Sequence, residues 1–293
     1  MKRYDGHIHL NTLDICPQHL LTRLEEAGLS GTCVISREPA ENNPLLELPD
    51  FSKRLDHVLA FCENHRDRLF PLLWVHPDED GIDAKVDEAI ERGILGFKMI
   101  CNNYFVYEEK CMRLLEKMAA ADKPVLFHSG ILWDGNVSSN YNKPVNWECC
   151  LEIPKLRFAL AHCSWPWYDE CIALYGKFLH ALNLRGDQTA EMFIDITPGT
   201  PPVYRKEVLM KLHGCAYDIQ NNLIFGTDCQ GHDYSVAWSK QWQDRDNSIY
   251  DELGVPESVR ELIYGQNLKR FLGLIPNTVQ HKAQKPDGTF EEV

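Results

Sequence analysis

The stretch Arg3-Tyr4-Asp5-Gly6-His7-Ile8-His9-Leu10 decides how the rest of the chain is interpreted. It predicts a short β-strand, and side chains two positions apart on a strand point to the same face. His7 and His9 are therefore expected to present two imidazoles side by side at one end of this strand. Imidazole suits zinc and other transition metals. A chance pair on a solvated strand is the plainer interpretation, so the metal hypothesis depends on the remaining sequence.

Seven further short apolar segments predict buried strands. They cover 31–36, 69–75, 95–100, 124–128, 156–162, 192–196 and 222–228. Helical patterns occupy about 17–27, 51–64, 80–92, 107–121, 168–182 and 203–212, with a short helix near 146–153 and a last one over 257–272. Alternation of strands and helices implies a parallel sheet. Eight such units in 293 residues predict an α/β fold of the closed (β/α)₈ type, a TIM barrel.

We find no internal repeat and no linker that would divide the sequence. One barrel domain is therefore expected over 1–275, followed by a polar C-terminal tail over 276–293. Loop insertions over the barrel mouth are expected near 130–146 and 229–255. An open doubly wound sheet is the alternative architecture, but it usually carries a glycine-rich phosphate loop, and neither common pattern of such a loop occurs.

The composition excludes several classes of partner. A net charge of −13 argues against binding to nucleic acid or an anionic membrane. No stretch reaches the ~18 apolar residues of a transmembrane helix, and the first residues lack the apolar core of a signal peptide. The 11 cysteines are scattered, without a Cys-x-x-Cys pair. We expect a cytoplasmic protein with reduced thiols that acts on a small-molecule substrate.

Polar residues stand at the ends of four predicted strands. His7 and His9 end the first strand, His128 the fifth, His162 the sixth and Asp228 the eighth. The active sites of TIM barrels lie at the carboxyl ends of the strands, so these side chains are expected to gather at one rim. Each residue alone has an ordinary surface or capping interpretation, but five such positions favour a metal site.

Six motifs in a fixed order carry a family resemblance. They are Asp5-Gly6-His7-Ile8-His9, Gly96-Phe97-Lys98, Pro124-Val125-Leu126-Phe127-His128-Ser129-Gly130, Phe158-Ala159-Leu160-Ala161-His162, Ile224-Phe225-Gly226-Thr227-Asp228 and Ile263-Tyr264-Gly265-Gln266-Asn267-Leu268-Lys269-Arg270-Phe271-Leu272-Gly273. Over about residues 3 to 273 the chain resembles the amidohydrolase superfamily. It is most similar to the amidohydrolase-related (amidohydrolase 2) family, which includes aminocarboxymuconate-semialdehyde decarboxylase-like and lactonase-like members. The motifs are specific for the fold and the metal site, but not for the substrate.

The resemblance implies that His7, His9, His128 and Asp228 hold one divalent metal ion. Zinc is the expected ion, and manganese or cobalt tolerates similar ligands. Two-metal members bridge their ions through a carboxylated lysine near the position of Lys98, but a single ion is more usual in this branch. Lys98 is therefore expected to face a substrate carboxylate or carbonyl with its ammonium group. The plainer alternative is that Lys98 has no role in the site and only extends its side chain so that the ammonium group reaches water.

The resemblance and the ligand chemistry together imply a metal-dependent hydrolase. It would cleave an ester, lactone or amide bond of a small carboxylate-bearing substrate through a water activated by the metal. Asp228 could accept the proton of that water, and His162 could act as a general base, general acid or oxyanion partner. The alternative is a zinc-dependent, non-oxidative decarboxylase of an aromatic or unsaturated acid. A binding module with a structural metal is disfavoured, because structural zinc usually has four protein ligands.

Other residues near the strand ends are candidates for substrate binding. His76 follows the third strand, and Arg37 follows the second and could bind an anion. Trp133 and Trp165 follow the fifth and sixth strands and could wall an apolar or aromatic pocket. The sequence does not identify the substrate, and it leaves the oligomeric state open. Dimers are common in the family it resembles, so a homodimer is a further expectation.

Overall fold

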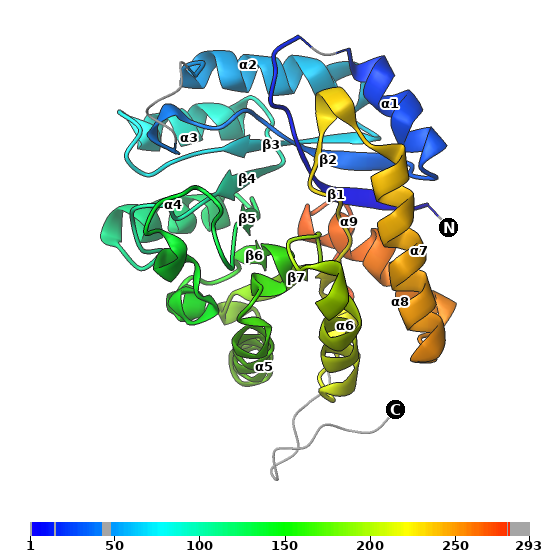
Figure 1. The fold of residues 1–293 in the computed structure, drawn as a ribbon. Helices are drawn as coiled ribbons and strands as arrows, with labels where there is room; N and C mark the ends of the chain where they lie inside the picture. Colours follow the sequence, from blue (N-terminus) through cyan, green and yellow to red (C-terminus); the bar gives the residue numbers. More distant parts are fainter. Residues whose placement is uncertain (1, 15, 43–47, 280, 282–293) are drawn as a thin grey trace.

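The computed structural model describes residues 2–14, 16–42, 48–279 and 281 (Figure 1). Within these residues, nine strands form one parallel sheet in the order β8-β7-β6-β5-β4-β3-β2-β1-β9. The strands are β1 (Tyr4–His9), β2 (Gly31–Ile35), β3 (Leu69–Trp74), β4 (Gly96–Met99), β5 (Val125–Phe127), β6 (Arg157–Leu160), β7 (Glu191–Asp195), β8 (Leu223–Ile224) and β9 (Cys229–Gln230). The predicted TIM-barrel fold is confirmed.

The barrel closes between the first and the last strands of the chain. β8 pairs with β7 and β9 pairs with β1, so residues 223–230 together occupy one strand position. The amide of Gly6 donates to the carbonyl of Phe225 at 2.8 Å, and the amide of Asp228 donates to the carbonyl of His7 at 2.9 Å. These bonds place the end of β8 directly beside the histidine pair of β1.

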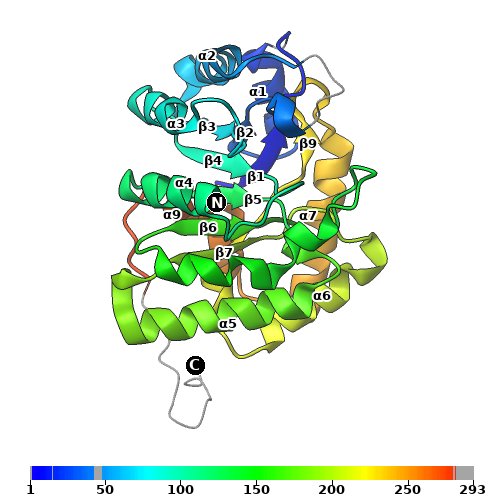
Figure 2. The ribbon, with the colours of Figure 1, turned by 90° about the vertical axis from the view of Figure 1, so that its left-hand side faces the viewer.

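Helices cover the outside of the sheet, as the two views of the ribbon show (Figures 1 and 2). They are α1 (Pro17–Glu26), α2 (Phe51–Cys62), α3 (Ile82–Glu91), α4 (Glu109–Ala120), α5 (Tyr168–Arg185), α6 (Arg205–Gly214), α7 (Val236–Glu252), α8 (Glu257–Glu261) and α9 (Asn267–Phe271). The short helix expected near 146–153 is a 3₁₀-helix over Pro144–Glu152. The last predicted helix is interrupted by a π-helical turn over Leu262–Gln266, between α8 and α9. No helix of the described residues is long and apolar enough to span a bilayer.

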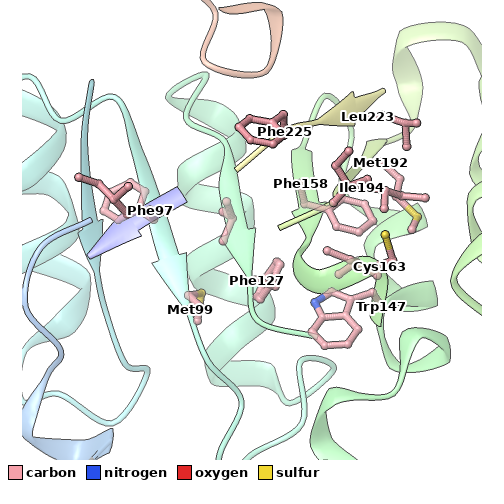
Figure 3. Packing of buried hydrophobic residues seen from close by; sticks show 14 of the residues in the cluster. Phe97, Met99, Phe127, Trp147, Phe158, Cys163, Met192, Ile194, Leu223 and Phe225 are labelled. Atoms are coloured by element: carbon pink, nitrogen blue, oxygen red, sulfur yellow. The ribbon is translucent and has the colours of Figure 1, made fainter. Parts of the chain in front are cut away.

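Two hydrophobic cores result from the alternation of side chains along the strands. On β5 and β6, Phe127 and Phe158 pack outward against the helices (Figure 3), whereas Leu126 and Ala159 belong to a second cluster inside the barrel. On β4, Phe97 and Met99 likewise join the outer core, which leaves Lys98 between them on the opposite face. The same alternation places the side chains of His7 and His9 on the same face of β1.

The loop predicted over 229–255 is mostly helix, and this prediction is wrong. Helix α7 occupies Val236–Glu252 and is capped by Ser235, whose hydroxyl accepts the amide of the residue three positions on, at 3.2 Å. Its inward face carries the charged residue Asp246, which is buried because it pairs with Arg205 at 2.6 Å. A charge in the buried stripe interrupts the apolar period by which helices are recognised in a sequence.

The other predicted insertion and the tail are only partly regular. The segment near 130–146 contains a 3₁₀ turn over Ser139–Asn142 and leads into the 3₁₀-helix that follows it. The beginning of the predicted tail packs back on the barrel, where the His281 imidazole lies 3.0 Å from a carboxylate oxygen of Asp218. Residues 282–293 of that tail lie outside the described residues.

Candidate metal centre

Three side chains converge where β1 meets the segment between β8 and β9. Nε2 of His7 lies 3.1 Å from Nε2 of His9. Oδ1 of Asp228 lies 3.6 Å from the first of these nitrogens and 3.5 Å from the second. Within the residues that the structure describes, these three form the only group of three or more His, Cys, Asp or Glu side chains with the spacing of metal ligands. Two imidazoles and a carboxylate suit a divalent transition metal.

Asp5 holds Asp228 in place from the neighbouring strand. Its Oδ1 accepts the backbone amide of Thr227 at 2.9 Å, and its Oδ2 accepts the hydroxyl of the same residue at 2.6 Å. Asp228 follows directly, with a φ of 58° in the left-handed region that is uncommon for residues other than glycine. The buried Asp5 carboxylate therefore fixes the turn that directs Asp228 towards the histidines.

Behind the metal centre, Oδ2 of Asp195 accepts a hydrogen bond from Nδ1 of His7 at 2.7 Å, and both side chains are buried. Burial lowers the pKa of His7 and of His9 well below the usual value, so both imidazoles are neutral at pH 7. An ionised carboxylate only accepts hydrogen bonds, so the single proton of His7 lies on Nδ1. Its Nε2 then carries a lone pair that faces His9 and Asp228, as a metal ligand requires.

Two further titratable groups at the centre are strongly influenced by burial. Burial raises the pKa of Asp228 to about 7, although the charge of Lys98 opposes this change. Burial also lowers the pKa of Lys98 to about 8, against the attraction of Asp228 and Asp195. Nζ of Lys98 lies 3.4 Å from Nε2 of His7, so the lysine predicted to face the substrate is at the metal centre itself.

His128 and His162 lie next to this centre. The His162 ring is 5.0 Å from that of His128 and 5.6 Å from that of His7, measured between ring centroids. Nε2 of His128 lies 3.2 Å from the carbonyl oxygen of Ile131, and His128 is not part of the group with metal-ligand spacing. Its role as a ligand therefore stays a prediction. Burial lowers the pKa of His162 to about 4.

An unusual backbone turn presents His162 to the centre. His162, Cys163 and Ser164 have φ values of 62°, 48° and 58°, all in the left-handed region. Gly199 packs on the imidazole so closely that a Cβ there would lie 2.6 Å from Cβ and Cγ of His162. Such strained residues persist only where the surrounding structure holds them, and they cluster at functional sites.

A cavity of about 650 Å³ opens over the five predicted strand-end residues. Its lining also includes Lys98, Arg37, Trp133 and Trp165, which are predicted substrate-binding residues. The indole rings of Trp133 and Trp165 are stacked, with centroids 6.3 Å apart and an angle of 14° between the planes. The volume falls within the range of pockets that hold small-molecule ligands.

His76 is outside the set of described residues that line this cavity. Its ring is fully buried, with Nε2 at 3.2 Å from the amide oxygens of Asn102 and Asn103. The edge of the ring meets the Tyr104 ring at 4.9 Å between centroids. After β3 the chain therefore directs this histidine into the loop that follows β4 rather than towards the metal centre.

Several residues of the site are not apparent from the sequence alone. Asp195 is the most important of these, and Asn11, Glu38, Gly199 and Gln230 also line the cavity. A signal for Asp195 was present, because it is a carboxylate in an otherwise apolar strand and a buried charge requires a partner. Asn11, Glu38 and Gly199 lie in connecting segments, and Gln230 ends the two-residue strand β9. No strand pattern in the sequence predicts these positions over the barrel mouth.

Sequence comparison identifies the family. A family model described as Amidohydrolase matches residues 40–274, which is most of the chain. The protein therefore belongs to the amidohydrolase 2 family of the amidohydrolase superfamily. The matched range begins after β1, so the placement of His7 and His9 comes from the structure. No curated protein matches the chain.

Solved structures of low sequence identity share the fold. An uncharacterised TIM-barrel protein from Bordetella bronchiseptica is 14% identical with a TM-score of 0.66, and the match covers 93% of this chain and 99% of that one. A probable 2-pyrone-4,6-dicarboxylic acid hydrolase from Acinetobacter baumannii is 13% identical with a TM-score of 0.59, covering 93% and 100%. An amidohydrolase 2 from Bifidobacterium longum subsp. infantis is 12% identical with a TM-score of 0.55, covering 94% and 100%.

Proposed function

We propose that this amidohydrolase is a metal-dependent hydrolase that cleaves an ester, lactone or amide bond in a small substrate carrying a carboxylate. The observation that supports this most is the convergence of His7, His9 and Asp228 in the wall of an open cavity. Structural metal sites are usually closed by four protein ligands, whereas catalytic sites keep a position open to the substrate. The open cavity therefore favours an enzyme over a binding module.

His7, His9 and Asp228 would hold the ion, with His128 as the predicted fourth ligand. When bound, a divalent cation supplies a Lewis acid that polarises a carbonyl oxygen and makes water more acidic. Zinc is the ion we expect, with manganese as the alternative, because imidazole and carboxylate ligands serve both. A second ion would require Lys98 to be carboxylated.

His162 and Asp228 are the proposed proton-transfer residues. His162 is neutral at pH 7 because burial lowers the pKa of its imidazole, so it can accept a proton from the attacking water. It could return that proton to the leaving group later in the reaction. Asp228 faces the same cavity and offers a second proton acceptor beside the two ligand histidines.

The substrate class follows from the charges and rings that surround the cavity. Arg37 and Lys98 provide two cations, which suits an anionic group such as a carboxylate. The stacked Trp133 and Trp165 provide a flat apolar wall for an unsaturated or aromatic part of the substrate. One solved structure of the same fold is described as a probable hydrolase of a pyrone dicarboxylic acid, which is consistent with this class.

A matched panel of substrates tests the proposal. Lactones, esters and amides with a free carboxylate are compared with the same compounds capped as methyl esters or carboxamides, using protein loaded with zinc or manganese. Acid release is followed by titration, and CO₂ is measured in the same reactions. We expect hydrolysis of at least one free carboxylate, at a rate roughly 10-fold or more above its capped form, because a hydrogen bond to a charged group contributes about 1.5–3 kcal/mol.

Two variants make the result specific. Arg37→Gln should reduce the preference for the carboxylate while leaving the capped compounds unaffected, and His162→Ala should abolish turnover of both. CO₂ release without a hydrolytic product would identify the protein as a decarboxylase and overturn the hydrolase assignment. Metal binding without turnover of any member of the panel would favour the binding module.

A further inference from the structure

Asp195 is a buried carboxylate that contacts the proposed metal centre from behind. It lies at the end of β7, and its Oδ2 accepts Nδ1–H of His7 at 2.7 Å. On the other side of the same ring, Nε2 faces His9 at 3.1 Å and Asp228 at 3.6 Å. The two ring nitrogens of His7 therefore have opposite partners, a carboxylate behind the ring and the metal centre in front of it.

Thr197 holds the Asp195 carboxylate in one orientation. Its backbone amide donates to Oδ1 at 2.6 Å, and its hydroxyl donates to the same oxygen. Oδ1 thus accepts two donors, which leaves Oδ2 to accept the proton of His7. All three residues are buried, so water does not compete for these bonds.

Gly226 provides the room in which this arrangement fits. A Cβ at Gly226 would lie 2.5 Å from the Thr197 hydroxyl and 2.9 Å from Cβ of His7. The end of β7, the start of the turn after β8 and the histidine strand therefore pack at the closest approach that the backbone permits. A side chain at this position would separate His7 from the carboxylate.

We propose that Asp195 is a positioning residue that fixes the tautomer of His7 and thereby sets the affinity of the metal centre. By accepting Nδ1–H, it keeps the lone pair on Nε2, directed at the ion, and its charge makes this nitrogen a stronger ligand. Removal of a carboxylate that orients a metal-binding histidine in this way typically weakens metal binding by 10–100-fold. The proposal rests on the proposed metal centre, but the tautomer of His7 can be measured without metal.

The variant Asp195→Asn should invert the tautomer rather than merely weaken the bond. The two donors of Thr197 require an acceptor, so the amide oxygen of the asparagine will occupy the position of Oδ1. Its NH₂ group then faces Nδ1 of His7 and donates to it. Because Nδ1 must accept this bond, the ring proton moves to Nε2 and the lone pair no longer faces the metal.

The first measurement uses metal-free protein labelled with ¹⁵N-histidine. The resonances of His7 are assigned by their loss in His7→Gln, and their shifts report which nitrogen carries the proton. We expect the Nδ1–H form in the wild type and the Nε2–H form in Asp195→Asn. Asp5→Asn is the matched control, because Asp5 is equally buried but contacts the amide of His7 rather than its ring. That variant should keep the Nδ1–H form.

The second measurement is the zinc dissociation constant, from competition with a chromophoric chelator. Asp195→Asn should bind zinc at least ~10-fold more weakly than the wild type. Thr197→Val keeps the carboxylate and its bond to His7, so we expect the Nδ1–H form and a smaller loss of zinc affinity.

A wild-type His7 in the Nε2–H form would overturn the proposal even if Asp195→Asn does not fold. An unchanged affinity in folded Asp195→Asn would also overturn it, whereas a wild type with the expected tautomer but no zinc binding would refute the metal centre instead.

Discussion

Nε2 of His9 lies 3.5 Å from Oδ1 of Asp228, although the two residues come from the first and last strand positions of the barrel. Closure of the sheet through the pairing of β1 with β9 is what brings them together. The proposed metal centre therefore requires the closed barrel, because neither half of the sequence contains all of its predicted ligands. Folding and metal binding should consequently be coupled.

Three alanine substitutions separate the proposed ligands from the proposed proton-transfer residue. We expect His9→Ala and Asp228→Ala to lose the metal, because each variant retains only two of the three converging ligand atoms. His162→Ala should retain about one equivalent of metal and lose turnover. The measurements are metal content by elemental analysis and turnover on the best substrate of the panel. Full metal occupancy in Asp228→Ala would contradict the ligand assignment.

Gly199 provides a test of how His162 is held. In Gly199→Ala the new Cβ would lie 2.6 Å from the base of the imidazole, so His162 has to move. Activity should fall by about 100-fold or more, since displacements of ~1 Å at a catalytic group have effects of this size, while metal content stays the same. Gly214→Ala is the control, because nothing lies within 4 Å of a Cβ at that position. Equal activities of the two variants would argue against a catalytic role for His162.

Much of the fold could be predicted from the sequence because most strands are short apolar runs separated by amphipathic helices. Helix α7 is not apparent in the sequence, and the reason is physical. Its buried face includes Asp246, which is compatible with the interior only because Arg205 approaches from another helix. A pairing between distant charges leaves no periodic signal in the sequence, so the segment reads as a polar loop.

The site was predictable to the extent that strand ends determine it. His7, His9 and Asp228 converge because the carboxyl ends of parallel strands meet at one rim. Arg37 and the stacked tryptophans also reach the cavity that the sequence pattern indicates. His76 does not, since the fold of the following loop buries its ring against Tyr104. The conformation of a loop depends on such local packing, and this packing produces no periodic pattern from which it could be predicted.

The buried pair of Arg205 and Asp246 should contribute strongly to stability. Two guanidinium nitrogens donate to the two carboxylate oxygens at 2.8 and 2.6 Å, and a third bond reaches the carbonyl of Ile196 at 2.6 Å. Asp246→Ala leaves the arginine buried without its partner, which should lower the free energy of unfolding by about 3–5 kcal/mol. Urea denaturation measures this difference.

A surface ion pair on the same two helices serves as the control. Glu252 pairs with Lys206, but both side chains are more than half exposed, so Glu252→Gln should leave the free energy of unfolding nearly unchanged. A loss in Asp246→Ala no larger than the loss in Glu252→Gln would show that the buried pair does not anchor α7.

His281 makes stability depend on pH above neutrality. Hydrogen bonds and the charges of Asp218 and Glu191 outweigh burial and raise the pKa of His281 from 6.5 to about 9. A raised pKa in the folded state gives a stabilisation that is complete below pH 6.5 and disappears as the pH rises through about 9. The contribution is at most about 3.5 kcal/mol, from roughly 1.4 kcal/mol for each pKa unit.

The variant His281→Gln isolates this contribution. The difference in unfolding free energy between the wild type and His281→Gln, measured by urea denaturation, should shrink steadily between pH 6.5 and pH 9.5. Other groups that titrate in this range are common to both proteins and cancel in the difference. A difference that stays constant across the range would show that His281 is not charged in the folded protein.

The metal content of the chain shows whether the proposed metal centre exists. Elemental analysis is done on protein purified without added metal or chelator, and again after reconstitution with zinc and with manganese. We predict about one equivalent per chain, lost in Asp228→Ala and retained in His162→Ala. About two equivalents would place a carboxylated Lys98 between two ions and would still support hydrolysis. Absence of bound metal, even after reconstitution, would refute the metal centre and leave only the barrel fold.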